Sequence, residues 1–66
     1  MNMTEARKYA KNVGVEIGKL TTERDSQGEY TVYEDGFDTR FTQWEEGKNA
    51  TDAKIAYILA KADGWY

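Results

Sequence analysis

Residues 29–44 read Glu-Tyr-Thr-Val-Tyr-Glu-Asp-Gly-Phe-Asp-Thr-Arg-Phe-Thr-Gln-Trp, and this stretch decides the fold. Two alternating, aromatic-rich segments flank Asp35-Gly36. An Asp-Gly pair in this setting is the strongest short-range signal for a β-hairpin with a type I′ turn. The sequence therefore predicts strands over Glu29–Glu34 and Phe37–Trp44, joined by a two-residue loop.

A two-residue loop also predicts the register of this hairpin. It pairs Glu34 with Phe37, Val32 with Thr39 and Tyr30 with Phe41, and paired residues share one side of the sheet. We expect this side to face the core, through Tyr30, Val32, Phe37 and Phe41. The opposite side then carries Thr31, Tyr33, Asp38, Arg40, Thr42 and Trp44.

A helix is predicted before the hairpin, with Thr4 as its N-cap and Glu5 in its first turn. Its apolar positions recur at spacings of three and four: Met3, Ala6, Ala10, Val13, Ile17 and Leu20. Two endings are compatible with this pattern. In the favoured one the helix stops near Gly14, and a first strand covers Val15–Arg24. In the other the helix runs to about Leu20, and only Thr21–Arg24 is extended.

The rest of the chain completes one small α+β domain that spans residues 1–66. Asp25-Ser26-Gln27-Gly28 reads as a turn between the first extended segment and the hairpin. A second helix follows, capped by Asn49 or Thr51, with an apolar stripe of Ile55, Ile58, Leu59 and Ala62, and it ends at Gly64. We expect a helix, an antiparallel meander of two or three strands, and a helix, with both helices on one sheet face.

Composition limits the function. The chain has no cysteine and no histidine, which removes thiolate chemistry and the side chain that titrates near neutrality. Its carboxylates show neither calcium-loop spacing nor a sign of burial, and its glycines do not match a phosphate-binding loop. We therefore expect no enzyme activity, no catalytic residues, no metal site and no cofactor. No apolar segment reaches the length of a membrane span, and no secretory signal is evident, so we expect a cytoplasmic protein.

Charge points to a protein partner. Residues 29–46 hold six acids against one base, a net charge of −5, whereas the remaining residues carry +2. Aromatic side chains and arginine dominate binding hot spots, and an acidic rim attracts basic surfaces. We expect a small binding module that docks this hairpin onto a basic partner surface, in the manner of phage-encoded modulators or inhibitors of nucleic-acid-handling proteins. The predicted partner-binding residues are Tyr33, Glu34, Asp35, Asp38, Arg40, Trp44, Glu45 and Glu46.

Two other functions are compatible with the sequence. The first is nucleic-acid binding through the basic first helix or through stacking on the open sheet face, although the acids of the hairpin would repel phosphate. The second is a structural subunit that assembles through an exposed strand edge. In a further alternative, the C-terminal Trp65 and Tyr66 cover the open sheet face, and this face then binds no partner.

Overall fold

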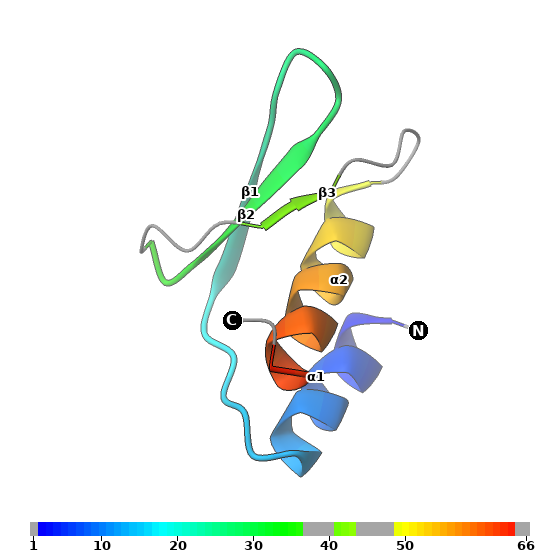
Figure 1. Ribbon diagram of the computed structural model, residues 1–66, viewed down its shortest axis with the longest axis vertical. Helices are drawn as coiled ribbons and strands as arrows, with labels where there is room; N and C mark the ends of the chain where they lie inside the picture. The colour runs from blue at the N-terminus through cyan, green and yellow to red at the C-terminus, as the bar shows by residue number, and fades with distance from the viewer. Residues whose placement is uncertain (1, 37–40, 44–48, 65–66) are drawn as a thin grey trace.

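The computed structural model describes residues 2–36, 41–43 and 49–64, and for 41–43 it describes the backbone alone. The element order is α1 (Met3–Asn12), β1 (Leu20–Arg24), β2 (Tyr30–Glu34), β3 (Phe41–Gln43) and α2 (Ala50–Ala62). The strands form one antiparallel sheet in the order β1-β2-β3 (Figure 1). The predicted α+β fold is confirmed, with three strands in the meander.

Helix α1 begins two residues earlier than predicted. Its N-cap is Asn2, whose Oδ1 accepts the backbone N–H of Glu5 at 2.8 Å, and Thr4 lies inside the first turn. The helix ends at Asn12, followed by Gly14 with φ +84°. Glycine adopts this left-handed conformation without a steric cost, so it terminates the helix. The shorter of the two predicted helices is therefore confirmed, and the extension to Leu20 is wrong.

Residues 15–19 do not extend β1, although a strand over Val15–Arg24 is predicted. The guanidinium of Arg7 donates to the carbonyls of Ile17 and Gly18, at 3.2 Å each. Side-chain carboxylates accept the N–H groups of Gly18 and Lys19 from the other side. Side chains thus satisfy much of the backbone that a ladder would otherwise use.

The β1–β2 hairpin closes through the predicted turn at Asp25-Ser26-Gln27-Gly28. The Asp25 Oδ1 accepts the N–H groups of Gln27 at 2.9 Å and Glu29 at 3.0 Å. Gly28 has φ +85°, a conformation that favours glycine. The turn aligns the two strands so that Thr22 lies opposite Val32 and Arg24 lies opposite Tyr30.

The β2–β3 pairing differs from the predicted register by two residues. Val32 lies opposite Phe41 and Tyr30 opposite Gln43, whereas a two-residue loop would place Tyr30 opposite Phe41. Asp35 and Gly36 both have positive φ, at 55° and 76°, as a type I′ turn requires, and the described part of β3 is Phe41–Gln43. A shift of two residues preserves the side of the sheet on which each residue lies, because side chains alternate with a period of two. Residues 37–40 and 44 of the predicted strand lie outside the described residues.

Helix α2 is capped by Asn49, whose Oδ1 accepts the N–H of Asp52 at 2.8 Å, which confirms the first of the two predicted caps. Gly64, with φ +87°, ends the helix as predicted. The Tyr9 hydroxyl of α1 donates to Asp63 at 2.7 Å, so the end of α2 is tied to α1. Among the described residues, no helix is long and apolar enough to cross a membrane.

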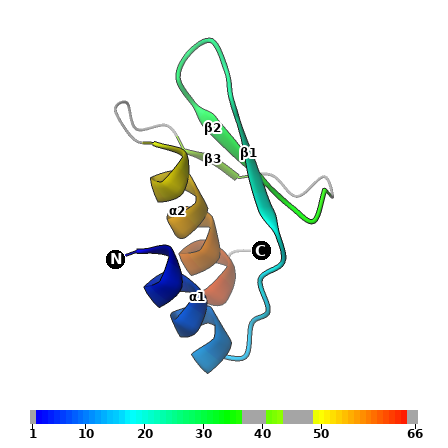
Figure 2. The same cartoon turned by 180° about the vertical axis from the view of Figure 1, so that it is seen from behind.

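The core lies between the sheet and the helices. Both helices occupy one side of the sheet; α2 packs directly against the three strands, and α1 packs against α2 (Figure 1 and Figure 2). Of the predicted stripe on α2, Ile58 is fully buried, and Ile55, Leu59 and Ala62 are partly buried around it. The buried residues are Ala6, Ala10, Leu20, Val32, Ala53, Tyr57 and Ile58. The complete burial of Tyr57 is not predicted by the stripe.

Candidate functional site

The sheet has a face that points away from α2. Alternation along the ladder places Thr21 and Glu23 of β1 beside Thr31 and Tyr33 of β2 on this side, and we call these four residues the outward face. Thr21 and Glu23 are exposed, while Thr31 and Tyr33 are half-buried. No helix of the described chain covers this face. It carries two threonine hydroxyls, the Glu23 carboxylate and the Tyr33 ring.

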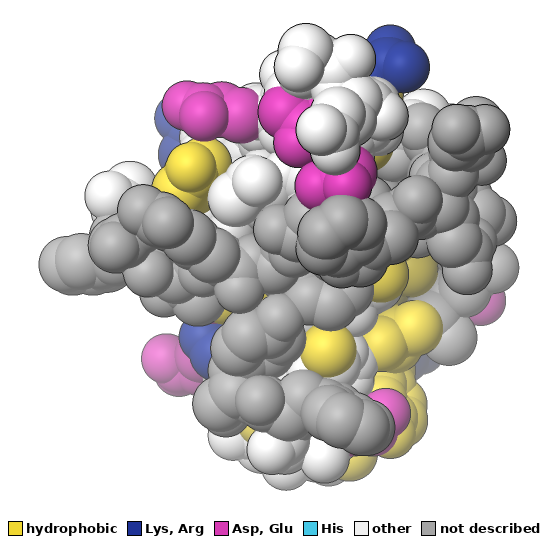
Figure 3. Space-filling model, turned by 45° about the horizontal axis from the view of Figure 1, so that its top comes forward, with side chains coloured by type: hydrophobic (Ala, Val, Ile, Leu, Met, Phe, Trp, Pro, Cys, Tyr) yellow, Lys and Arg dark blue, Asp and Glu magenta, His cyan; other side chains and the backbone are white. Residues whose placement is uncertain are grey.

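Acidic side chains gather near the β1–β2 turn, at the end of the sheet that projects beyond the helices. Figure 3 shows acidic and polar side chains around this projecting end, with basic side chains beside them. The acids come from Glu23, Asp25 and Glu29. Partial burial of Glu29, together with the neighbouring Asp25 carboxylate, raises the pKa of Glu29. The second of these causes places the Glu29 and Asp25 carboxylates close to each other at this turn.

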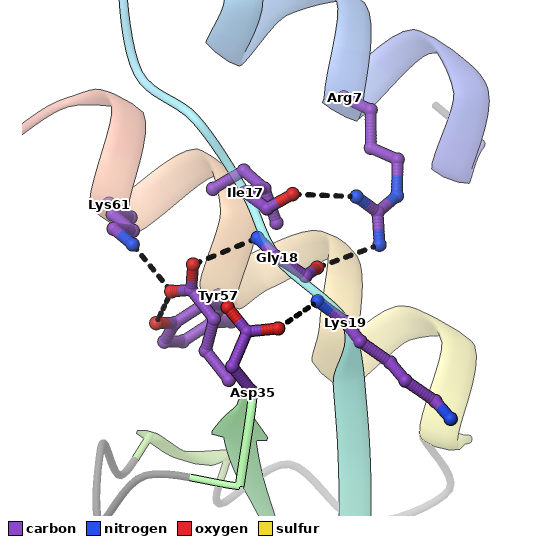
Figure 4. A network of polar contacts seen from close by, with 8 residues as sticks. Arg7, Ile17, Gly18, Lys19, Asp35, Tyr57 and Lys61 are labelled. Atoms are coloured by element: carbon purple, nitrogen blue, oxygen red, sulfur yellow. Dashed lines mark hydrogen bonds and ion pairs between the residues drawn. The ribbon is translucent and has the colours of Figure 1, made fainter.

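The structure separates the predicted partner-binding residues into three groups. Tyr33 lies on the outward face, as expected. Glu34 and Asp35, which the sequence predicts in the acidic rim, turn their side chains toward α2 and residues 18–19 (Figure 4). The other predicted residues lie outside the described part of the chain: Asp38, Arg40, Trp44, Glu45 and Glu46.

The carboxylate of Glu34 joins three segments of the chain. Its Oε1 accepts the hydroxyl of Tyr57 at 2.5 Å and forms an ion pair with Lys61, both from α2. Its Oε2 accepts the N–H of Gly18 at 2.9 Å. The Glu34 side chain is only 12% exposed, so these contacts are shielded from water. Glu34 is the partly buried carboxylate of this network, and no charged side chain among the described residues is fully buried, in agreement with the sequence-based expectation.

These contacts control the ionisation of Glu34. Partial burial raises its pKa, but hydrogen bonds from Lys61, Tyr57 and the Gly18 N–H, together with the charge of Lys61, outweigh that effect. The pKa of Glu34 therefore lies below its usual value. The ionised carboxylate is the form that the fold stabilises.

We expect this shift to make stability depend on pH. A carboxyl whose pKa is lower in the folded than in the unfolded chain stabilises the fold above its unfolded pKa of about 4.3, and this stabilisation is lost as pH falls through the folded value. Urea unfolding from about pH 6 to about pH 3 should show the wild type losing its advantage over Glu34→Gln as Glu34 becomes protonated. A constant difference between the two proteins across that range would contradict the assignment.

Asp35 fastens the same end of β2 to the chain before β1. Its Oδ1 accepts the N–H of Lys19 at 2.7 Å, and its own N–H donates to the Lys19 carbonyl at 2.7 Å. Its carboxylate lies over the Cα of Gly18, where an added Cβ would come within 1.9 Å of Oδ2. Glu34 and Asp35, with Gly18, Lys19, Tyr57 and Lys61, form what we call the clamp (Figure 4).

The alternation of residues along β2 predicts that the Glu34 side chain of the clamp points toward the helices. Glu34 follows Tyr30 and Val32 at a spacing of two, so it lies on the side of β2 that faces the helices. A carboxylate on that side needs a cation or a donor from α2. The apolar stripe of α2 does not identify Tyr57 and Lys61 as these partners, because neither residue belongs to it.

A groove lies between α1 and residues 15–17, with a volume of about 390 Å³. Its lining combines two cations, one carboxylate and two aliphatic side chains: Arg7, Lys11, Glu16, Val15 and Ile17. The guanidinium of Arg7 is held by two backbone carbonyls there. Within the described residues, no cluster of three or more acidic, histidine or cysteine side chains is arranged to hold a metal ion.

Comparisons of the chain with protein-family models, with curated proteins and with solved structures found no match. A function is therefore argued from the surface of the molecule itself.

Proposed function

We propose that this protein is a small non-enzymatic binding module that docks the outward face and the acidic β1–β2 turn onto a basic surface of another protein. The observation that supports this proposal is the outward face, which no helix of the described chain covers and which carries Tyr33. Tyrosine combines a large apolar area with a hydroxyl that tolerates water, and it is enriched at binding hot spots.

The charge of the hairpin supports the choice of a basic partner. Glu23 lies on the outward face itself, and Asp25 and Glu29 lie at the adjoining turn. The Lys61 ammonium compensates Glu34 within the fold, so Glu34 adds little to this potential. A surface with these acids, of which Glu23 and Asp25 are exposed, attracts a basic protein over a distance of about 10 Å at 0.1 M salt.

Nucleic-acid binding would use either the basic side of α1 or stacking on the open sheet face. The guanidinium of Arg7 is already engaged with two backbone carbonyls, and the acids of the hairpin repel phosphate. Protein binding is therefore the function that the described surface favours.

A site-specific crosslinker tests which face binds. We would replace Tyr33 with a photoreactive phenylalanine, and would place the same group at Tyr9 as a matched control, because Tyr9 is 38% exposed on α1. We expect position 33 to crosslink one basic protein in lysate of the native host, and position 9 to crosslink it far less. Equal crosslinking from both positions would refute the proposed face. Loss of the crosslink after nuclease treatment would favour nucleic-acid binding instead.

With that partner purified, Tyr33→Ala should weaken its affinity at least tenfold, because truncation of a central aromatic side chain costs roughly 2 kcal/mol or more. The melting temperature should change little, since Tyr33 lies outside the buried core. Calorimetric titration at two salt concentrations measures the affinity loss caused by Tyr33→Ala and the contribution of charge to binding. The affinity of the wild type should fall as salt rises. A Tyr33→Ala variant that binds as tightly as the wild type would exclude this residue from the interface.

A further inference from the structure

β1 is an edge strand, because the sheet order is β1-β2-β3. Two backbone hydrogen bonds that flank the ladder fix its phase: Asp35 donates to the Lys19 carbonyl, and Asp25 donates to the Glu29 carbonyl. In an antiparallel pair, bonded and non-bonded positions alternate. Odd-numbered residues of β1 therefore bond to β2. The residues that direct their N–H and C=O groups to the opposite edge are Leu20, Thr22 and Arg24.

Within the described residues, nothing pairs with this second edge of β1. The strand is short and carries two charged residues, Glu23 and Arg24, but it lacks the stronger features that prevent further pairing. It contains neither proline nor lysine, and its ladder with β2 runs through five consecutive pairs without a bulge. An edge of this kind is a template for another strand.

We propose that the partner of this edge is β1 of a second copy of the chain, paired antiparallel about a two-fold axis at Thr22. In this register Thr22 faces Thr22 of the second copy, and Leu20 faces Arg24. Each of these positions directs its backbone groups to the edge, so each pair exchanges two hydrogen bonds. The edge is therefore complementary to itself, and this property favours a second copy over an unrelated strand.

The side chains support the same register. Glu23 lies opposite Thr21 of the second copy, so no like charges face each other across the interface. A register centred on Glu23 would bring two carboxylates together, and one centred on Thr21 would lose one of the bonded pairs. Neither alternative register pairs as many backbone N–H and C=O groups without placing like charges opposite each other.

The two-fold axis runs perpendicular to the sheet, so the two outward faces lie on the same side and the helices on the other. The dimer thereby doubles the three-stranded sheet. A strand pairing of this length buries a small area, so we expect a reversible dimer with a dissociation constant in the micromolar to millimolar range. The inference rests on the edge of β1 and does not depend on the proposed function.

Analytical ultracentrifugation over a wide range of protein concentrations tests the dimer. We expect the mass to rise from 7.6 kDa toward twice that value. Thr22→Pro should keep the mass at that of one chain, because proline removes the outward N–H of Thr22 and is tolerated on the free side of an edge strand. Its circular dichroism and melting temperature should stay close to those of the wild type.

Thr21→Pro is the matched control, because the N–H of Thr21 belongs to the ladder with β2. This variant should lose stability, because its proline breaks the ladder with β2. The comparison separates damage to the fold from loss of pairing at the free edge of β1. A wild-type chain that stays monomeric at every concentration would overturn the proposal and leave the edge to a strand of another protein. A dimer that survives Thr22→Pro would also overturn it, because another surface would then hold the two copies together.

A disulfide gives a second, independent readout in a chain that has no cysteine of its own. The Cα atoms of an antiparallel bonded pair lie about 5.5 Å apart, within the range that a disulfide spans. Thr22→Cys should therefore form a linked dimer on mild oxidation, whereas Thr31→Cys, on the central strand, should not. Equal linking of both variants would contradict the proposed register.

Discussion

Glu34→Ala should lower the melting temperature by about 10 °C, because it removes a shared acceptor from the clamp. The Tyr57 hydroxyl, the Lys61 ammonium and the Gly18 N–H all lose their contact with this carboxylate. Removal of a partly buried charged partner of this kind costs about 2 kcal/mol. In a domain of this size, each kcal/mol corresponds to roughly 4–8 °C. Thermal unfolding at neutral pH, followed by circular dichroism, measures the effect.

Two further variants separate the stabilisation that comes from the charge of Glu34 from that of its hydrogen bond with Tyr57. Glu34→Gln keeps an acceptor oxygen but removes the charge, so its loss should be smaller than that of Glu34→Ala. Tyr57→Phe removes only the hydroxyl, and the double variant Glu34→Ala/Tyr57→Phe should be less destabilised than the sum of the two single changes. Additive losses would show that Glu34 and Tyr57 do not stabilise the fold through each other. A Glu34→Ala protein that melts with the wild type would show that the Glu34 carboxylate contributes nothing to stability.

Gly18→Ala should destabilise the protein by about 1–3 kcal/mol, because the new methyl group occupies the place of a neighbouring carboxylate. The added Cβ would lie 1.9 Å from the Oδ2 atom of Asp35, so that side chain must move. Its movement would break the 2.7 Å hydrogen bond from the Lys19 N–H to Oδ1. Urea unfolding of the variant measures the loss directly.

The control for Gly18→Ala is the same change in an Asp35→Gly background. Glycine tolerates the φ of 55° that Asp35 adopts, so this background keeps the turn while it removes the obstructing carboxylate. Gly18→Ala should then cost only a small fraction of its effect in the wild type. If the cost is the same in both backgrounds, contact with Asp35 does not explain it.

The clamp connects stability to the proposed interface. Glu34 and Asp35 anchor the end of β2 to α2 and to residues 18–19, while Tyr33, one residue earlier, lies on the opposite side of the strand. The two faces of β2 thus have different roles in this arrangement. The inward residues hold the strand in place, and no helix of the described chain covers the outward residues.

Much of the local structure is predictable from short sequence signals. Gly14 and Gly64 end the two helices, Asn49 caps the second, and residues 25–28 form the turn. Each of these features depends on neighbours within a few residues, where capping and left-handed φ values act. Alternation along β2 likewise identifies its inward and outward sides, and a shift of two residues in the β2–β3 register leaves those sides unchanged.

Only the tertiary structure decided how those pieces are joined. The clamp brings together residues separated by 16, 23 and 27 positions in the chain, and no local pattern specifies which donor meets which carboxylate. The Arg7 guanidinium binds the carbonyls of residues 17 and 18 across 10 and 11 positions of the chain, and no local pattern specifies these contacts either. Local backbone preferences therefore determine where elements begin and end, whereas long-range hydrogen bonds and burial determine the final pairing and the surface that is left exposed.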